Sequence, residues 1–152
     1  MKDAEDNIRT RFGLLVAVVA AAVVGVVAFG AARASASSAP IVITYAKTCD
    51  EVTGHCVGTA GSGGTLEMQV TSFRVTGNDA QLTLTEWITV GDISFTAEMN
   101  GHQSPAGFIV LDGTVTAGSF VGAHVHQRSN LVGAAGDTTT WTGGLQLLPA
   151  SA

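Results

Sequence analysis

The chain is poor in charge and in catalytic signatures. Charged residues make up 12% of its 152 residues, and past residue 36 three basic residues stand against nine acidic ones, a net charge of −6. An acidic domain without a basic patch repels phosphate backbones, so nucleic acid is not an expected partner. The chain also lacks a Gly-x-Ser-x-Gly elbow, a phosphate-binding loop and a convincing Ser/His/Asp set, so nothing in it resembles a hydrolase.

Cysteine is scarce as well. Cys49 and Cys56 are the only two, with six residues between them. In an exported domain we expect this pair to form a disulfide that closes a small loop, a contribution of roughly 2–3 kcal/mol. A redox or metal site that includes His55 is the alternative, and an oxidising compartment favours the disulfide.

An uncharged, apolar run covers residues 12–32. It follows a basic start at Lys2, Arg9 and Arg11. Small-residue cleavage patterns follow, which is typical of a secretory signal. The run exceeds the ~7–15 residues of a signal core and approaches the ~20 that span a bilayer, so an uncleaved membrane anchor is the alternative. No cysteine follows it directly, since the first is Cys49, so lipoprotein attachment is not expected. We expect residues 1–36 to be the leader with its linker, and residues 37–152 to be one secreted or extracytoplasmic domain.

Low charge density and abundant Thr, Val and Gly favour strands over helices, which predicts an all-β domain. The clearest hairpin surrounds Gly91-Asp92, a two-residue turn signal with glycine first. Around that turn every apolar position meets an apolar or small partner on the same face, so turn chemistry and hydrophobic pattern agree. The predicted pairs are Val90 with Ile93, Ile88 with Phe95, Glu86 with Ala97, and Leu84 with Met99.

Other alternating stretches predict further strands, beginning at residues 41–46 and ending at residues 138–148. We expect the cysteine loop and residues 61–64 to form a long flexible connection. The total is seven or eight antiparallel strands in meander order, preceded by the signal or membrane-spanning helix. Such a set must close into a barrel or fold into a sandwich. The consecutive hairpins, without a Greek-key crossover, favour the small barrel.

Glu86 is the clearest anomaly in the pattern, because it occupies an apolar-face position between Leu84 and Ile88. A carboxylate that faces a core must pair, form hydrogen bonds or raise its pKa. The functional interpretation is an acid or ligand-orienting group inside a barrel lumen. The structural alternatives are a bulge that turns it outward, or a pair with Arg74.

Residues 113–130 contain a second candidate. We expect a tight turn near Ala117-Gly118 and then a strand that carries His124, His126 and Arg128 on one face. If Val121, Ala123 and Val125 pack inward, these polar side chains lie in solvent. If Phe120 and the histidines face inward, they join Glu86 in one pocket.

The histidine pair also permits a metal-binding interpretation, because two histidines at i and i+2 on a strand point the same way. The spacing Gly118-x5-His124-x-His126 matches the opening of the first cupin motif, although Asn130 stands where that motif expects a Glu. A cupin-like metal-binding barrel is therefore an alternative. The main interpretation needs no metal and no cofactor.

Residues 113–123, Gly-Thr-Val-Thr-Ala-Gly-Ser-Phe-Val-Gly-Ala, resemble the glycine-rich hairpin of the allene oxide cyclase and dirigent barrels. Residues 86–98, Glu-Trp-Ile-Thr-Val-Gly-Asp-Ile-Ser-Phe-Thr-Ala-Glu, are similar to the small bacterial barrels of the spirotetronate-cyclase type. The likeness covers about residues 65–130 and consists of turn glycines and alternation. It implies a barrel whose lumen takes an elongated apolar molecule and confines it in a reactive conformation without a cofactor.

Together these observations favour an exported barrel that hosts a hydrophobic small molecule, and that steers its cyclisation or isomerisation if the protein is an enzyme. The alternative is a non-catalytic structural or envelope domain with a filled core. The candidate binding or catalytic residues are Glu86, His124, His126 and Arg128, and the candidate lumen residues are Leu84, Ile88, Phe95, Met99, Phe108 and Phe120.

Overall fold

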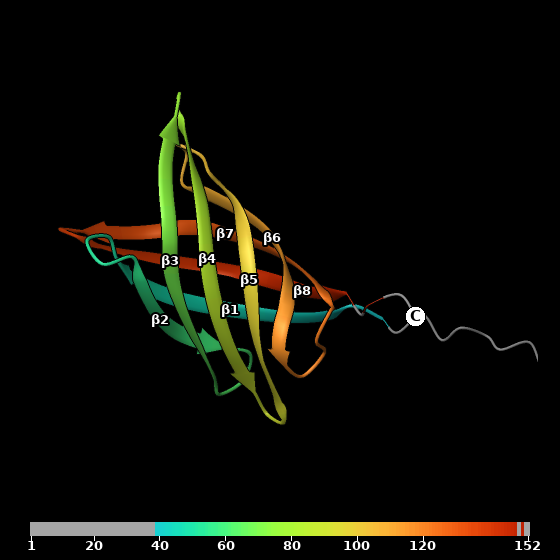
Figure 1. Ribbon diagram of the computed structural model, residues 1–152. Coiled ribbons are helices and arrows are strands. Elements are labelled where there is room, and N and C mark those ends of the chain that lie inside the picture. The colour runs from blue at the N-terminus through green and yellow to red at the C-terminus, as the bar shows by residue number, and fades with distance from the viewer. Residues whose placement is uncertain (1–38, 149, 151–152) are drawn as a thin grey trace, which may run out of the picture. The chain divides into compact units, whose positions relative to one another are not determined.

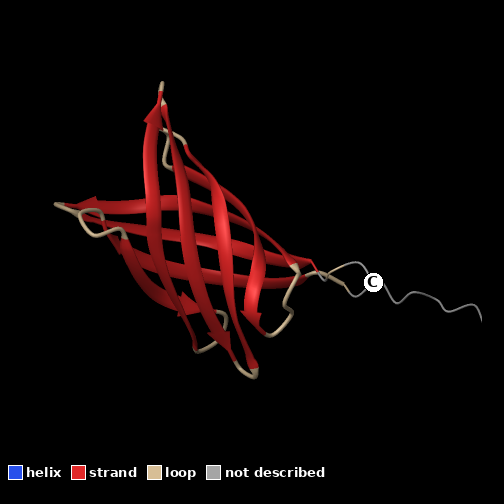
Figure 2. Cartoon of the chain, in the orientation of Figure 1, coloured by secondary structure: helices blue, strands red, loops and turns tan. Residues whose placement is uncertain are grey.

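Eight antiparallel strands close into one barrel in the computed structural model, which describes residues 39–148 and Ala150 (Figures 1 and 2). Each strand pairs with the next along the chain, and β8 returns to pair with β1. The predicted all-β meander barrel is confirmed, and the predicted leader lies outside the described residues. The strands are β1 (Ile41–Asp50), β2 (His55–Ala60), β3 (Gly64–Thr76), β4 (Asp79–Val90), β5 (Ile93–Gln103), β6 (Phe108–Gly118), β7 (His124–Ala135) and β8 (Thr138–Leu148).

The β4–β5 hairpin has the predicted register. Val90 pairs with Ile93 and Ile88 with Phe95, and the next two inward pairs follow as predicted. Gly91 has a φ of 57°, the positive value that the first position of such a turn requires. Local turn chemistry therefore fixes which side chains of β4 and β5 face the interior.

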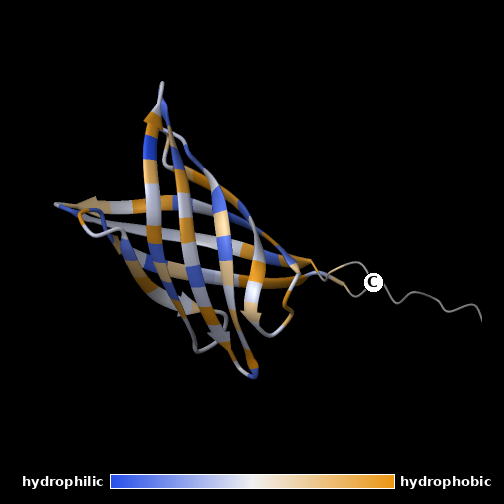
Figure 3. Cartoon of the chain, viewed as in Figure 1, coloured by the Kyte–Doolittle hydropathy of each residue, from blue (hydrophilic) through white to orange (hydrophobic). Residues whose placement is uncertain are grey.

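Buried and exposed residues alternate along the strands. Figure 3 shows that hydropathy also alternates along the strand ribbons. Period-two alternation follows from the pleat of a strand. An eight-stranded barrel is just wide enough for its inward side chains to fill it or to hold one small ligand. The interior is largely apolar, with Leu66, Leu84, Ile88, Phe95, Met99, Leu111, Val125, Trp141, Leu145 and Leu147 among its buried residues.

The expected flexible connection after Cys49 is wrong, because residues 55–60 form the short strand β2. A Cβ at Gly58 would collide with the carbonyl oxygen of Ala46, so glycine is what lets β2 approach β1 this closely. Cys49 and Cys56 face each other in the β1–β2 register and form the predicted disulfide. The disulfide therefore ties the shortest strand of the barrel to its neighbour.

The two ends of the barrel differ in which turns they carry. Ile41 pairs with Leu147 at the end where the strand region starts and finishes, which we call the terminal end. Asp50 pairs with Thr138 at the opposite end, which also carries the turns after β1, β3, β5 and β7 (Figure 1). Among the described residues, no helix is long and apolar enough to cross a membrane.

The turn between β6 and β7 lies later than predicted. β6 continues through Gly118, and residues 119–123 make the turn. Phe120 has a φ of 64°, a left-handed conformation that is uncommon for a bulky residue, and its carbonyl accepts a hydrogen bond from the Ala123 amide. The expected turn at residues 117–118 is therefore wrong, and Phe120 belongs to the turn and not to a strand.

Candidate functional site

Five buried polar side chains form a belt inside the barrel between its two ends. Each occupies an inward position on its strand, as the alternation of buried and exposed residues along β1, β4 and β7 shows. Water does not reach these groups, so each needs a partner within the protein. This polar belt consists of Tyr45, Lys47, Glu86, Gln127 and Ser129.

Glu86 is fully buried, at 0% exposure, and Gln127 reaches it from across the lumen. The Gln127 side-chain amide donates a hydrogen bond of 3.1 Å to Glu86 Oε1. Glu86 Oε2 and Gln127 Oε1 are both buried without a hydrogen-bond partner. Burial raises the pKa of Glu86, opposed by the charge of Lys47 and by the Gln127 hydrogen bond. A proton on Glu86 is thus the donor that this pair of side chains lacks.

Lys47 is almost as deeply buried, at 2% exposure. Its Nζ donates a hydrogen bond of 3.2 Å to the thioether sulfur of Met68, a weak acceptor, and lies 5.2 Å from the centroid of the Tyr45 ring. Burial lowers the pKa of Lys47, and the charge of Glu86 opposes that shift. Lys47 is therefore an amine in apolar surroundings without a strong hydrogen-bond acceptor.

Lys47 and Glu86 influence each other without forming a direct ion pair within the described residues. Met68 contacts Lys47 and is also the cross-strand neighbour of Glu86 in the β3–β4 register. Two separated buried charges cost several kcal/mol each in lost hydration. Burial therefore shifts both pKa values toward the uncharged forms, and the charge of each group opposes the shift of the other.

Tyr45 and Ser129 complete the belt on the other side of Lys47. Their hydroxyl oxygens lie 2.5 Å apart, and the Tyr45 hydroxyl donates to the Arg128 carbonyl at 3.2 Å. Burial raises the pKa of Tyr45 to about 12, so its hydroxyl keeps its proton at any physiological pH. This pair is a satisfied structural contact, in contrast to the unpartnered oxygens at Glu86 and Gln127.

A pocket of about 320 Å³ lies at the end of the barrel opposite the terminal end, and Lys47 and Met68 are among the residues that line it. Its walls are mostly apolar and include the disulfide, whereas Glu86 does not line it. The inward residues that contribute to it come from β1, β2, β3, β4, β6 and β8. They are Lys47, Cys49, Cys56, Met68, Leu82, Leu84, Ile109, Leu111 and Trp141.

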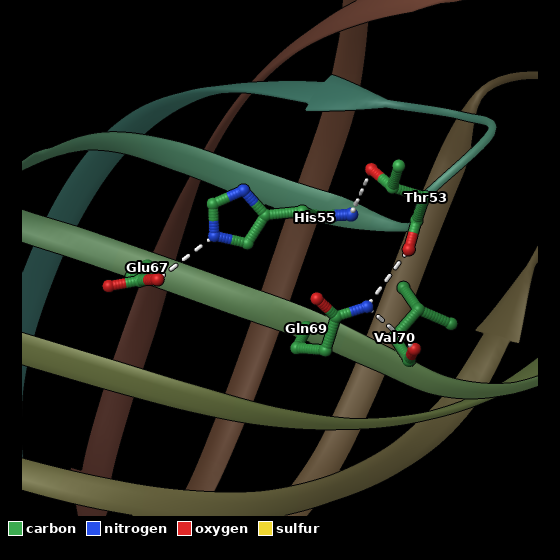
Figure 4. A network of polar contacts seen from close by, with 5 residues as sticks. All are labelled: Thr53, His55, Glu67, Gln69 and Val70. Atoms are coloured by element: carbon green, nitrogen blue, oxygen red, sulfur yellow. Dashed lines mark hydrogen bonds and ion pairs between the residues drawn. The ribbon is translucent and has the colours of Figure 1, made fainter.

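The turn between β1 and β2 forms part of the pocket rim and is held by polar contacts (Figure 4). The Gln69 amide donates to the carbonyl oxygens of Thr53 at 2.9 Å and Val70 at 3.1 Å, which ties the turn to β3. Asp50 accepts hydrogen bonds from the amides of Val52 and Thr53, and these bonds, with Thr53 first, lower its pKa. The rim therefore carries a fixed carboxylate above the buried amine.

His55 lies beside this rim on the outer surface of the barrel. Its Nε2 is 2.9 Å from Glu67 Oε1, an exposed contact shown in Figure 4. The metal or redox site proposed as the alternative for the cysteine pair therefore lacks support, because the cysteines form a disulfide and His55 pairs with Glu67.

Of the two placements that the sequence left open for the histidine pair, the structure has the one that faces solvent. Val125, Gln127 and Ser129 face inward on β7, so alternation places His124, His126 and Arg128 on the outer surface. There, Asp112 Oδ1 lies 3.2 Å from His124 Nε2 and 2.8 Å from His126 Nδ1, and Arg128 Nε donates to His126 Nε2 at 3.1 Å. We call these four residues the outer cluster.

The outer cluster supplies no metal site within the described residues, which contain no group of three or more His, Cys, Asp or Glu side chains able to hold an ion. The hydrogen bond from His126, and then the charges and bonds of both histidines, lower the pKa of Asp112. The histidines are therefore partners of a surface carboxylate and not a wall of the lumen.

Two other expected placements are wrong. Phe108 is 54% exposed at the start of β6, and Phe120 is 41% exposed in the turn after it. Arg74 is exposed near the tip of the β3–β4 hairpin, beyond a register shift between Val70 and Ser72, so it is not the partner of Glu86. The remaining candidates, Leu84, Ile88, Phe95 and Met99, are buried inside the barrel, and of these only Leu84 lines the pocket.

The alternation of residues in the first strand also places Lys47 inward, but the predicted strand ended at residue 46, one residue before it. Ile43 and Tyr45 alternate on one face of the first strand, and the next residues on that face are Lys47 and Cys49. Because β1 continues to Asp50, the same alternation carries Lys47 inward. Alternation likewise places Gln127 inward, because it lies two residues after Val125 on β7.

No protein-family model, no curated protein and no solved structure matches this chain. The resemblance to the allene oxide cyclase and dirigent barrels therefore stays a prediction. The features that point to a function lie inside the barrel. They are the buried amine of Lys47, the buried acid of Glu86 and the pocket.

Proposed function

We propose that this barrel binds a hydrophobic small molecule in the pocket above Lys47. The supporting observation is the pocket itself, whose volume of about 320 Å³ falls within the ~300–1,000 Å³ typical of small-molecule sites. Its apolar walls and single buried basic group match the usual composition of such sites, in which a few polar groups fix the orientation of an apolar ligand.

The enzymatic form of this proposal is a cofactor-independent cyclase or isomerase that confines its substrate, as the resemblance implies. In that form Lys47 replaces Glu86 as the polar group that meets the substrate, because Glu86 lies outside the pocket lining. Glu86 then acts indirectly, because its charge opposes the lowering of the Lys47 pKa by burial.

Export of the domain is part of the proposal. The Cys49–Cys56 disulfide is typical of an oxidising compartment, and disulfides are rare in the cytosol. A secreted or membrane-anchored barrel would take up its ligand outside the cytoplasm, where a closed lumen keeps an apolar molecule out of water.

A non-catalytic structural domain is the second candidate, and one observation favours it. The terminal end of the lumen is filled by buried side chains such as Phe95, Val125 and Leu147, so only one end of the barrel is open to a ligand. In this alternative the pocket is a shallow depression that binds nothing specifically.

A fluorescent probe distinguishes the two candidates. The apolar dye N-phenyl-1-naphthylamine is titrated into the wild-type protein and two matched variants. Leu82→Trp fills the pocket, whereas Thr83→Trp adds the same side chain to the outer surface one residue along β4. We expect saturable binding to the wild type and Thr83→Trp, and about tenfold weaker binding to Leu82→Trp, which is the loss of about 1.4 kcal/mol of apolar contact.

Equal binding by all three folded proteins, or no saturable binding, would exclude the pocket as a ligand site. Thermal unfolding followed by circular dichroism checks that each variant folds. Native mass spectrometry of the gently extracted wild type gives a second measurement, because a co-purified apolar molecule should be lost from Leu82→Trp and retained by Thr83→Trp.

A further inference from the structure

We infer that Lys47 captures an aldehyde or ketone group of the ligand as an imine, an inference that rests on the proposed binding pocket. The ligand class is therefore an apolar molecule with a reactive carbonyl group. Three features of the interior lead to this inference: where Lys47 lies, what its amine contacts, and which charges surround the pocket.

Lys47 is placed as a nucleophile needs to be. It lines the pocket although its side chain is almost fully buried, so a ligand in the pocket lies against a lysine that is largely shielded from water. Its hydrogen-bond partner is the sulfur of Met68, which does not hold a proton on the amine as a carboxylate would. Desolvation in an apolar pocket is one of the established ways in which proteins activate lysine toward carbonyl groups.

A proton on Glu86 is compatible with a free amine at Lys47. Glu86 and Gln127 together present two buried oxygens without a donor, and a proton on Glu86 supplies one. A protonated Glu86 leaves no buried anion to stabilise an ammonium group at Lys47. The free amine, with its nitrogen lone pair available, is the consistent partner of that neutral acid.

The charges around the pocket favour a neutral carbonyl ligand over a carboxylate. Asp50 and Glu51 both line the pocket at its rim, and the Asp50 carboxylate is fixed there by the amides of the turn. The domain beyond residue 36 also carries a net charge of −6. These negative charges repel an incoming anion and leave an uncharged aldehyde or ketone unaffected.

The chemical step balances without an oxidant or a cofactor. The lone pair of Lys47 Nζ attacks the carbonyl carbon, and the electrons of the carbon–oxygen π bond move to oxygen, which gives a carbinolamine after one proton passes from nitrogen to oxygen. Departure of that oxygen as water takes the second amine proton and leaves a carbon–nitrogen double bond. One amine and one carbonyl thus give one imine and one water molecule.

Reductive trapping tests this inference on the full-length protein. The protein is incubated at neutral pH with the apolar aldehyde nonanal and sodium cyanoborohydride, and peptide mapping by mass spectrometry locates the alkylated amine. N-acetyl-lysine in the same solution reports the reactivity of an ordinary lysine. We expect Lys47 to be alkylated at least about tenfold faster than N-acetyl-lysine, because its buried amine lies against the bound aldehyde in the pocket.

Two further measurements separate pocket chemistry from chance modification. Excess N-phenyl-1-naphthylamine should slow alkylation of Lys47, because it occupies the same pocket. Lys47→Arg keeps a basic group but forms no stable imine, and it should lose the reduced adduct at position 47. The wild-type comparison with N-acetyl-lysine stands by itself if this variant does not fold.

The outcomes distinguish this inference from the proposed function. Dye binding without accelerated alkylation of Lys47 overturns the imine and leaves the ligand pocket intact. Saturable binding of nonanoate without trapping of nonanal also overturns it, in favour of a carboxylate ligand paired with an ammonium group. Failure of dye and aldehyde alike overturns both proposals.

Discussion

The polar belt inside the barrel and the outer cluster on its surface use the same chemical groups in opposite surroundings. Strand β7 contributes to both, since Gln127 and Ser129 point inward while His126 and Arg128 point outward. Inside, a carboxylate meets one amide donor and keeps an unpartnered oxygen. Outside, a carboxylate meets two histidines and has water available.

The difference shows that clustering of titratable residues in the sequence is a poor guide to where chemistry lies. His124, His126 and Arg128 stand out because they are close in sequence, yet water screens them. Lys47 and Glu86 are distant in sequence and inconspicuous, yet burial shifts the pKa of both. Environment decides reactivity, so the largest effects of substitution should come from the belt.

Loss of Gln127 should have the largest effect on stability. Gln127→Met keeps the approximate volume of the side chain but removes the donor to Glu86, and an unsatisfied buried group costs about 2–3 kcal/mol. The matched control on the same strand, His126→Met, should change the free energy of unfolding by less than about 0.5 kcal/mol. Urea unfolding of both variants measures the two values.

Similar values for the two variants would contradict the comparison, because they would mean that the belt and the outer cluster are equally accessible to water. A large loss in His126→Met alone would reverse it and make the outer cluster the structural centre.

The sequence predicts the barrel well because its evidence is local. Gly91 fixes a turn, and the turn fixes a register in which Ile88 meets Phe95, so one hairpin can be checked against its own pattern. Glu86 was identifiable for the same reason, as a polar residue in an apolar series. For residues 120–126, the local pattern does not decide whether the even-numbered or the odd-numbered residues face inward.

Contacts across the lumen account for what the sequence did not reveal. Gln127 meets Glu86 although 41 residues separate them, and Lys47 meets Met68 on a strand that is not its neighbour. These contacts depend on closure of the barrel, which no period in the sequence encodes. The pocket depends on closure too, because its lining comes from seven strands.

Substitution of Lys47 or Glu86 should give the next largest effect, a change in how the free energy of unfolding depends on pH. In the wild type the folded pair holds one proton, and the unfolded chain also holds one, on lysine, between the ordinary pKa values of 4.5 and 10.5. The pair therefore adds no slope to the free energy of unfolding between the folded-state pKa values of its two groups.

Single variants of the pair should acquire opposite slopes of about 1.4 kcal/mol per pH unit. In Lys47→Met, the folded state keeps the Glu86 proton that the unfolded state loses, so stability falls as the pH rises from 4.5 to the raised pKa of Glu86. In Glu86→Gln, the unfolded state binds the lysine proton that the folded state excludes, so stability rises from the lowered pKa of Lys47 to 10.5. Denaturant unfolding across this range measures both, and two variants that run parallel to the wild type would refute the shared proton.

The smallest effect should come from the outer cluster, and its dependence on salt sharpens the comparison. Asp112→Asn removes the carboxylate from both histidines, yet Asp112 is about half exposed, so we expect a loss of less than about 1 kcal/mol near pH 6. Because the pKa of Asp112 is lowered in the folded state, this contribution is present above the ordinary value of 3.8 and disappears as the pH falls through the folded-state value. Raising the salt from about 0.05 M to about 0.5 M should abolish most of it by screening, whereas the cost of Gln127→Met should not change. A loss at Asp112 that resists salt would show that the outer cluster is as protected from solvent as the belt.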